Sequence, residues 1–191
     1  MTITRKDARQ LLTESVKELA SRNPINKISV TEIARNCSLS TSAFYYYFSD
    51  KYELVSYVIN SEIDEQVKNG CMPIQEFLAH LLEMMESEQQ FYSNILENTL
   101  VDYPNHSFFH EMLDTHIKNM IVTNCMSLVP EDEMDLTLQV YLSGITGLMC
   151  SHVLTHRMSR RELLNAFVAA IPDPLKPYII TKKRGCKKTS G

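Results

Sequence analysis

Apolar residues recur every three to four positions along most of the chain, the spacing that gathers them on one face of an α-helix. The first stripe, within residues 4–22, consists of Ala8, Leu11, Leu12, Val16, Leu19 and Ala20. Similar stripes predict helices over about 50–68, 74–102, 106–128, 134–157 and 160–180. No segment alternates apolar and polar residues for long enough to predict a sheet. The pattern therefore predicts an all-α fold.

Capping residues and prolines mark several helix ends. Asn23-Pro24 ends the first helix, because the residue before a proline disfavours the α conformation. The segments Ser29–Glu32 and Ser159–Glu162 have the Ser-x-x-Glu spacing of a capping box, and each predicts a helix start. Pro172, Pro174 and Pro177 are expected to interrupt or bend the last helix in its middle.

Residues 29–48 have the pattern of two short helices joined by the three-residue turn Cys37–Leu39. This arrangement is typical of a helix-turn-helix, whose second helix enters the major groove of DNA. At 100° per residue, the second helix turns Leu39, Ala43, Phe44 and Tyr47 inward and Thr41, Ser42 and Tyr45 outward, with Tyr46 on the flank. Hydroxyls on an outward face suit contacts to base edges or phosphates. The alternative is an ordinary helical bundle without a role in DNA binding.

The distribution of charge favours a contact between the N-terminal end and a polyanion. The overall formal charge is −4, yet residues 1–52 hold 8 Lys/Arg against 5 acids, net +3. Residues 53–181 hold 6 Lys/Arg against 18 acids, net −12, and residues 182–191 add five positive charges. A nucleic-acid backbone is attracted to the first segment and repelled by the second.

Other classes of protein find little support in the composition. No apolar run approaches the ~18 residues that span a bilayer, and charges interrupt the N-terminus, so we expect a cytoplasmic protein without a signal peptide or membrane partner. The five cysteines are scattered, which favours reduced, buried side chains over disulfides or a zinc site. Phosphate-binding and nucleophile-elbow glycine motifs are absent from the sequence, and we expect neither an enzyme nor a cofactor.

The segment Ile28–Leu54 resembles the N-terminal signature of the TetR family of bacterial transcriptional regulators. The matching positions are Thr31, Ile33-Ala34, Ser40-Thr41-Ser42, the aromatic run Phe44–Phe48, Asp50-Lys51 and Leu54. The resemblance implies a homeodomain-like, three-helix DNA-binding domain followed by a helical effector and dimerisation domain. The boundaries expected are 1–66, with helix 50–68 as connector, then 67–181, and a basic flexible tail over 182–191.

Carried over by position, the resemblance implies contacts with double-stranded operator DNA by Thr31, Ser40, Thr41, Ser42, Tyr45, Tyr46 and Lys51. Thr31 and Lys51 fall at helix N-termini, where backbone N–H groups favour phosphate. The family often has lysine and glycine where this chain has Thr41-Ser42, and this departure leaves the operator sequence open. Its frequent glycine after the first helix is here Asn23-Pro24, which alters only a loop.

Paired half-sites require a dimer, and the resemblance implies a homodimer built from the last two long helices. The residues expected at this interface are Tyr141, Ile145, Leu148, Met149, Val153, Leu164, Phe167, Val168 and Ile171. The alternative is that the same residues form an intramolecular core.

The middle helices are candidates for enclosing a small apolar or aromatic effector. The expected lining residues are Phe77, Leu81, Met84, Met85, Phe91, Tyr92, Leu96, Phe109, Met112, Leu113 and Ile117. Plain core is the alternative, since methionine and aromatic stripes at helical spacing also fill ordinary interiors. The pairs His106–His110 and His152–His156 have the i,i+4 spacing of shared metal ligands, and Glu111, Asp114 and His116 lie nearby in sequence. Because cysteine partners and an H-E-x-x-H string are absent, we expect polar helix surface or hydrogen-bonded histidines and no metal.

The function expected is a repressor that an effector releases from a palindromic operator. A second hypothesis keeps DNA binding but replaces the small effector with a protein co-regulator, so that the chain acts as a regulator or co-activator controlled by that partner. A third, an enzyme with structural N-terminal helices, has no catalytic constellation to support it.

Overall fold

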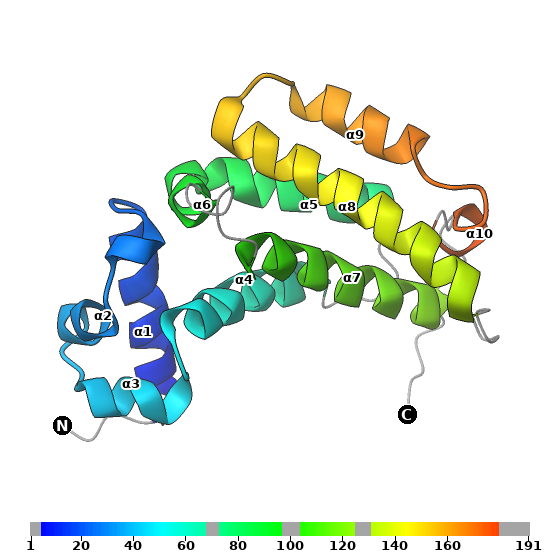
Figure 1. Ribbon diagram of the computed structural model, residues 1–191. Helices are drawn as coiled ribbons and strands as arrows, with labels where there is room; N and C mark the ends of the chain where they lie inside the picture. Colours follow the sequence, from blue (N-terminus) through cyan, green and yellow to red (C-terminus); the bar gives the residue numbers. More distant parts are fainter. Residues whose placement is uncertain (1–4, 68–72, 97–103, 125–130, 180–191) are drawn as a thin grey trace, which may run out of the picture. The chain divides into compact units, whose positions relative to one another are not determined.

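The computed structural model describes residues 5–67, 73–96, 104–124 and 131–179 (Figure 1). Every regular element in these ranges is a helix, so the predicted all-α fold is confirmed. The predicted basic tail, 182–191, lies outside the described residues. Contacts divide the chain into two compact units, residues 1–64 with 87–105 and residues 65–86 with 106–191.

The first unit begins with the helices predicted around the helix-turn-helix. Its elements are α1 (Arg5–Ala20), the 3-10 turn η1 (Ile25–Lys27), α2 (Val30–Asn36), α3 (Thr41–Tyr47), α4 (Lys51–Val67) and α6 (Gln89–Leu96). The boundary of the unit falls within α4, after residue 64. α1 ends at Ala20, before the predicted end near residue 22, and α4 begins at Lys51, close to the predicted start at residue 50.

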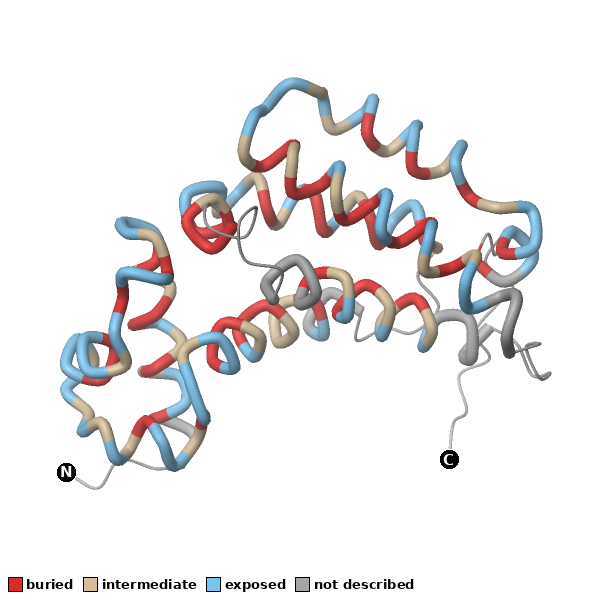
Figure 2. Tube along the Cα trace, in the orientation of Figure 1, coloured by how far each residue is buried: buried red, intermediate tan, exposed pale blue. Residues whose placement is uncertain are grey.

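The core of the first unit follows the apolar stripes. Leu12 and Val16 of α1, Ile33 of α2, Phe44 of α3 and Leu54 of α4 are all fully buried. Burial of such a side chain contributes about 1.5–3 kcal/mol to folding. In Figure 2, buried stretches alternate with exposed ones along the helices.

Helix α6 joins the first unit by packing on α1 and η1, although the sequence assigned it to the second domain. The amide of the buried Asn94 donates to the carbonyl oxygen of Ala20 at 2.8 Å. The ammonium of Lys17 lies 2.5 Å from a carboxylate oxygen of Glu62 and 2.6 Å from one of Glu88. A single helix over 74–102 was therefore wrong: a turn at Glu88 separates α5 from α6.

The second unit is built from longer helices. They are α5 (Ile74–Ser87), α7 (Pro104–Asn124), α8 (Glu131–Thr155), α9 (Arg160–Ala169) and α10 (Lys176–Ile179). The unit includes α5 up to residue 86 and α7 from residue 106. α7 begins at Pro104, earlier than predicted, because proline is favourable in the first turn of a helix. The predicted interruption by prolines is confirmed, since α9 ends at Ala169 and α10 follows Pro172 and Pro174.

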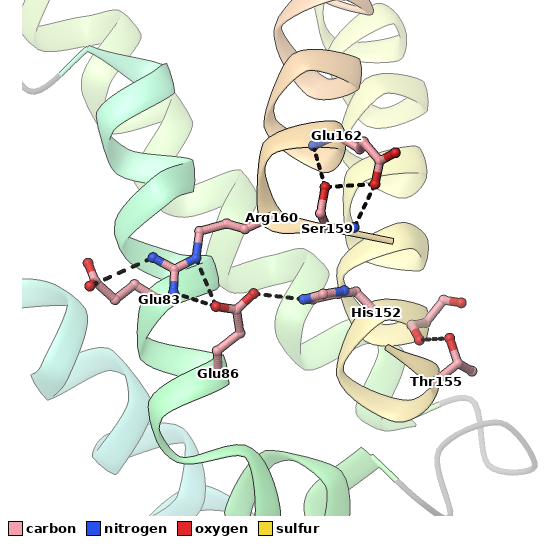
Figure 3. Close-up of polar contacts among 8 residues, drawn as sticks. Glu83, Glu86, His152, Thr155, Ser159, Arg160 and Glu162 are labelled. Carbon is pink, nitrogen blue, oxygen red and sulfur yellow. Dashed lines mark hydrogen bonds and ion pairs between the residues drawn. The ribbon is translucent and has the colours of Figure 1, made fainter. Parts of the chain in front are cut away.

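A polar network holds α5, α8 and α9 together (Figure 3). The guanidinium of Arg160 donates to Glu86 and lies 3.7 Å from Glu83. The other Glu86 oxygen lies 2.9 Å from Nε2 of the buried His152. Arg160 is the first residue of α9, directly after the N-cap Ser159, and the predicted capping box of Ser159 and Glu162 is present. The start of α9 is thus fixed both by its cap and by an ion pair to α5.

Among the described residues, no helix combines the length and the apolar character that crossing a membrane requires.

Candidate nucleic-acid interface

The predicted capping box at the start of α2 is present. The backbone N–H of Glu32 donates to Ser29 Oγ at 3.1 Å, and the backbone N–H of Ser29 donates to the Glu32 carboxylate at 2.7 Å. Ile33 and Ala34 then bury their side chains in the core of the first unit. Ser15 of α1 donates from its hydroxyl to the Ile33 carbonyl at 2.7 Å. These bonds fix the position of α2 on α1.

The turn after α2 is tight. Ser38 has φ 58°, in the left-handed region, where a residue other than glycine costs about 1–2 kcal/mol. The backbone N–H of Leu39 donates to the carbonyl of Ala34 at 2.8 Å, which closes the turn, and Leu39 is half-buried. The direction in which α3 leaves the turn is set by this closure.

Helix α3 begins after Ser40, as predicted, with Ser40 as its N-cap. Ser40 Oγ accepts from the backbone N–H of Ala43 at 3.1 Å, so this hydroxyl caps the helix and keeps its own hydrogen for donation. Phe44 is fully buried and anchors the helix, whereas Leu39, Ala43 and Tyr47 are half-buried.

The outward face of α3 is polar and aromatic. Ser42 is exposed and Thr41 is half-buried. Tyr45 is 57% exposed and Tyr46 is 65% exposed. Tyr46, expected on the flank of the helix, is at least as exposed as Tyr45. On α2, Thr31 is also exposed.

Lys51, expected to hold a phosphate, has partners within the chain. Its ammonium donates to the carbonyl oxygens of Ile28 at 2.7 Å and Asn26 at 3.1 Å. Burial lowers the pKa of Lys51 from 10.5, against the opposing effect of the nearby Glu32 and Asp50 charges. Lys51 therefore fastens the start of α4 to the segment that leads into α2, and its phosphate contact stays a prediction.

Two acids beside α3 are held by hydrogen bonds. Asp50 accepts from the backbone N–H groups of Tyr52 and Glu53 at 2.7 and 2.8 Å. Glu53 accepts from the backbone and hydroxyl of Ser49, and these bonds lower its pKa. Both carboxylates thus lie at the N-terminal end of α4, where the helix dipole favours negative charge.

Arg9 is a residue that the sequence reasoning missed. Its guanidinium lies 5.6 Å from the ring centre of Tyr47 and 5.5 Å from that of Tyr57, both cation–π distances. Arg9 thereby connects α1 to the end of α3 and to α4. The basic segment 1–52 was noted, but nothing in the sequence distinguishes this arginine from its neighbours.

A known family shares this arrangement. The profile of the family described as bacterial regulatory proteins, tetR family, matches residues 12–58, a range that contains α2, the turn and α3. Residues 12–58 are thus similar to the N-terminal region of TetR-family regulators. The predicted family is thereby confirmed, and it is a family of regulatory proteins, not of enzymes.

A curated relative and several solved structures agree with this assignment. The chain is 26% identical over 88 residues to the HTH-type dhaKLM operon transcriptional activator DhaS of Lactococcus lactis, a match that covers 45% of this chain and 47% of DhaS. The chain therefore aligns with about half the length of this curated relative.

Similar folds extend over most of the chain. A TetR transcriptional regulator from Streptococcus agalactiae has a TM-score of 0.62 at 19% identity, covering 87% of this chain and 94% of its own. The structure titled dihydroxyacetone kinase operon activator DhaS has a TM-score of 0.60 at 18% identity, covering 86% and 96%. These likenesses extend the TetR-family fold beyond the helix-turn-helix to the C-terminal helices.

The expected effector-pocket residues fall into two sets. Phe91, Tyr92 and Leu96 lie on α6 and are buried in the first unit, where the Tyr92 hydroxyl donates to Glu62 at 3.3 Å. The second unit holds Phe77, Leu81, Met84 and Met85 on α5 and Phe109, Met112, Leu113 and Ile117 on α7. All eight are buried except Met84, which is half-buried. The expected residues thus divide between the two units, because α6 packs on α1, and their role in an effector pocket stays a prediction.

The expected dimer residues are mostly core residues of the chain itself. Buried in the second unit are Tyr141, Ile145, Met149, Val153, Phe167 and Ile171, and the Tyr141 hydroxyl donates to the Phe167 carbonyl at 2.8 Å. Leu164 and Val168 are half-buried, and Leu148 is 41% exposed. Most of these residues therefore have partners within the chain itself, and their place at a dimer interface stays a prediction.

A different face of α8 carries exposed apolar side chains. Leu136 is 71% exposed and Val140 is 74% exposed, and with Leu148 they follow helical spacing. Gly144 and Gly147 fall in the same stretch, and a Cβ added to either would meet nothing within 4 Å. We refer to Leu136, Val140, Gly144, Gly147 and Leu148 as the open face of α8.

Two of the histidines singled out in the sequence have hydrogen-bonding partners. His110 Nε2 lies 2.5 Å from the Gln139 side-chain oxygen, and His152 contacts Glu86. The side chain of His106 lies outside the described residues.

Proposed function

We propose that the protein is a transcriptional regulator that binds double-stranded DNA through α2, its turn and α3. The observation that carries this proposal is the outward face of α3. Ser42, Tyr45 and Tyr46 are exposed on a short helix whose other side is anchored by Phe44. The family membership and the net +3 charge of residues 1–52 support the same contact.

The regulator is proposed to act as a homodimer. One helix-turn-helix makes few contacts, whereas a two-fold pair reads two half-sites separated by a helical turn of DNA or a multiple of it. The open face of α8 supports this part of the proposal, because exposed leucine and valine next to glycines suit close contact with a second copy.

The first proposed mode of regulation is repression. In this mode a small apolar or aromatic effector releases the repressor from its operator. An effector changes DNA affinity only if it binds the DNA-competent and incompetent forms unequally. The bonds from Lys17 to Glu88 and from Asn94 to Ala20 support such coupling. They make α6, which follows α5 after one residue, a part of the DNA-binding unit.

Activation, with or without a protein co-regulator, is the second mode. The relative named as an operon transcriptional activator supports this direction of control. The net charge of −12 in residues 53–181 suits a basic protein partner.

DNA binding is tested by competition between a palindromic fragment from the upstream region of its gene and random DNA at about 150 mM salt, since nonspecific binding is weak there. The double variant Thr41→Ala/Tyr45→Ala is expected to lose specific binding with its circular dichroism unchanged. Thr155→Ala on α8 serves as the control. A palindrome that competes no better than random DNA contradicts the proposal.

The mode of control is tested with a reporter gene behind the same fragment. Expression that rises on deletion of the regulator supports a repressor, and expression that falls supports an activator. Thermal-shift screening of aromatic metabolites then separates an effector from a protein partner, which a pull-down with the full chain identifies.

A further inference from the structure

Helix α3 offers none of the side chains that read guanine or adenine by paired hydrogen bonds. Arginine and lysine contact guanine in this way, and asparagine and glutamine contact adenine. α3 consists of Thr41, Ser42, Ala43, Phe44 and three tyrosines. The amide of Asn36, on α2, is already bonded to Ser15 at 3.2 Å and to Glu18 at 3.1 Å.

What α3 exposes instead is aromatic surface. Tyr45 and Tyr46 are 57% and 65% exposed. The hydroxyls of Ser42 and Thr41 bond to either kind of base pair and so discriminate weakly. Among the natural base edges in the major groove, the thymine methyl is the apolar one, and apolar side chains contact it.

Both exposed rings are supported by a neighbouring ring. Tyr45 packs edge-to-face on the buried Phe44, with ring centres 5.6 Å apart. Tyr46 packs edge-to-face on Tyr47 at 5.0 Å, and Arg9 lies over Tyr47. Side chains restricted in this way lose less conformational entropy when they contact a ligand.

We propose that Tyr45 and Tyr46 read thymine methyl groups in the major groove, so that the operator half-sites are rich in A·T pairs. The inference rests on the proposed function and adds the chemistry of the DNA that α3 selects. The rings supply the apolar contact, and the hydroxyls of Ser42 and Thr41 bond to whatever base edge lies beside it.

The test begins with selection of binding sites from random DNA by the full chain, followed by replacement of each half-site thymine by deoxyuridine. This change removes one methyl and leaves the Watson–Crick pair intact. Loss of one buried methyl is expected to weaken binding about fourfold, from the transfer free energy of a methylene-sized group. At thymines outside the half-sites the same replacement is expected to have no effect.

Protein variants assign the methyl contact to the rings. Tyr46→Phe and Tyr45→Phe keep the ring and are expected to keep the fourfold sensitivity to deoxyuridine. Tyr46→Ala and Tyr45→Ala are each expected to lose the sensitivity at the thymines that the removed ring contacts and to keep it at the thymines that the remaining ring contacts. Tyr52→Ala, which removes an exposed tyrosine from α4, is the matched control and is expected to retain the sensitivity.

The outcomes separate this inference from the proposed function. A chain that binds no DNA specifically contradicts both. Selected half-sites rich in G·C pairs, or A·T-rich sites insensitive to deoxyuridine, leave DNA binding intact and overturn the thymine contact in favour of hydroxyl or shape readout. Loss of sensitivity in the phenylalanine variants overturns the role of the rings.

Discussion

The side-chain amide of Asn94 donates a hydrogen bond to the main-chain carbonyl of Ala20, across 74 positions of sequence. Ala20 is the last residue of α1, and its carbonyl has no partner within the helix. Both residues are buried, so this bond satisfies a group that water does not reach.

Replacement of Asn94 by alanine is expected to loosen the attachment of α6 to α1. A buried acceptor left without a partner costs about 1–3 kcal/mol, so amides of α6 and the last turn of α1 are expected to exchange roughly tenfold faster or more. Hydrogen exchange followed by mass spectrometry measures this. Asn165→Ala, at an exposed position of α9, is the control, and equal exchange in the two variants contradicts the prediction.

Glu86→Gln is expected to destabilise the second unit at neutral pH by about 1–3 kcal/mol, the range for hydrogen bonds to charged groups. Burial by itself raises the pKa of Glu86, but the bonds and charges of Arg160 and His152 outweigh it and lower the pKa below 4.5. A lowered carboxyl pKa stabilises the fold above 4.5, and the effect disappears as pH falls through the folded-state value.

The difference in unfolding free energy between the parent chain and Glu86→Gln should therefore shrink in acid. Urea unfolding of the full chain at a series of pH values, followed by circular dichroism, measures it. Glu83→Gln, whose carboxylate is 61% exposed, is expected to cost less than about 1 kcal/mol. If the difference in unfolding free energy grows below pH 4.5, the stabilising role of the Glu86 carboxylate is contradicted.

Lys51→Met is expected to lower thermal stability as well as DNA affinity. The ammonium is bonded to the carbonyls of Asn26 and Ile28, and their loss costs about 1 kcal/mol or more. Lys27→Met removes an exposed charge from the same segment and is expected to leave the melting temperature unchanged. A Lys51→Met chain that weakens DNA binding but melts normally would show that the lysine serves only as a phosphate contact.

Gly144→Glu is expected to dissociate the proposed homodimer without unfolding the chain. The added Cβ meets nothing within 4 Å in the single chain, whereas a charge on the open face of α8 disfavours close contact between copies. Analytical ultracentrifugation is expected to show a monomer with unchanged circular dichroism and weakened operator binding. His80→Glu, on the exposed side of α5, is the matched control. A dimer that survives the substitution contradicts this interface.

Local signals predicted much of the first unit. The capping box at Ser29, the start of α3 after Ser40 and the burial of Phe44 depend on residues only a few positions apart, and each is present. The turn at Glu88 was missed, because it contains neither proline nor glycine and the apolar period continues through it.

The spacing of apolar residues does not predict which residues distant in sequence contact one another. α8 is apolar on more than one side, since Leu136 and Val140 are exposed while Tyr141 and Ile145 are buried. A stripe on such a helix does not reveal which side faces the chain's own core. Likewise, nothing near Lys51 in sequence reveals that its ammonium reaches back to the carbonyl of Ile28.

The place of α6 in the first unit has a consequence for how the protein is made. The unit that carries the helix-turn-helix is completed by residues 89–96, which are synthesised after the whole of α5. When only α1 to α4 of a nascent chain have emerged from the ribosome, the chain still lacks Asn94, whose side chain bonds to Ala20. The two units are interleaved along the gene, so the N-terminal one cannot finish folding before synthesis of the second has begun.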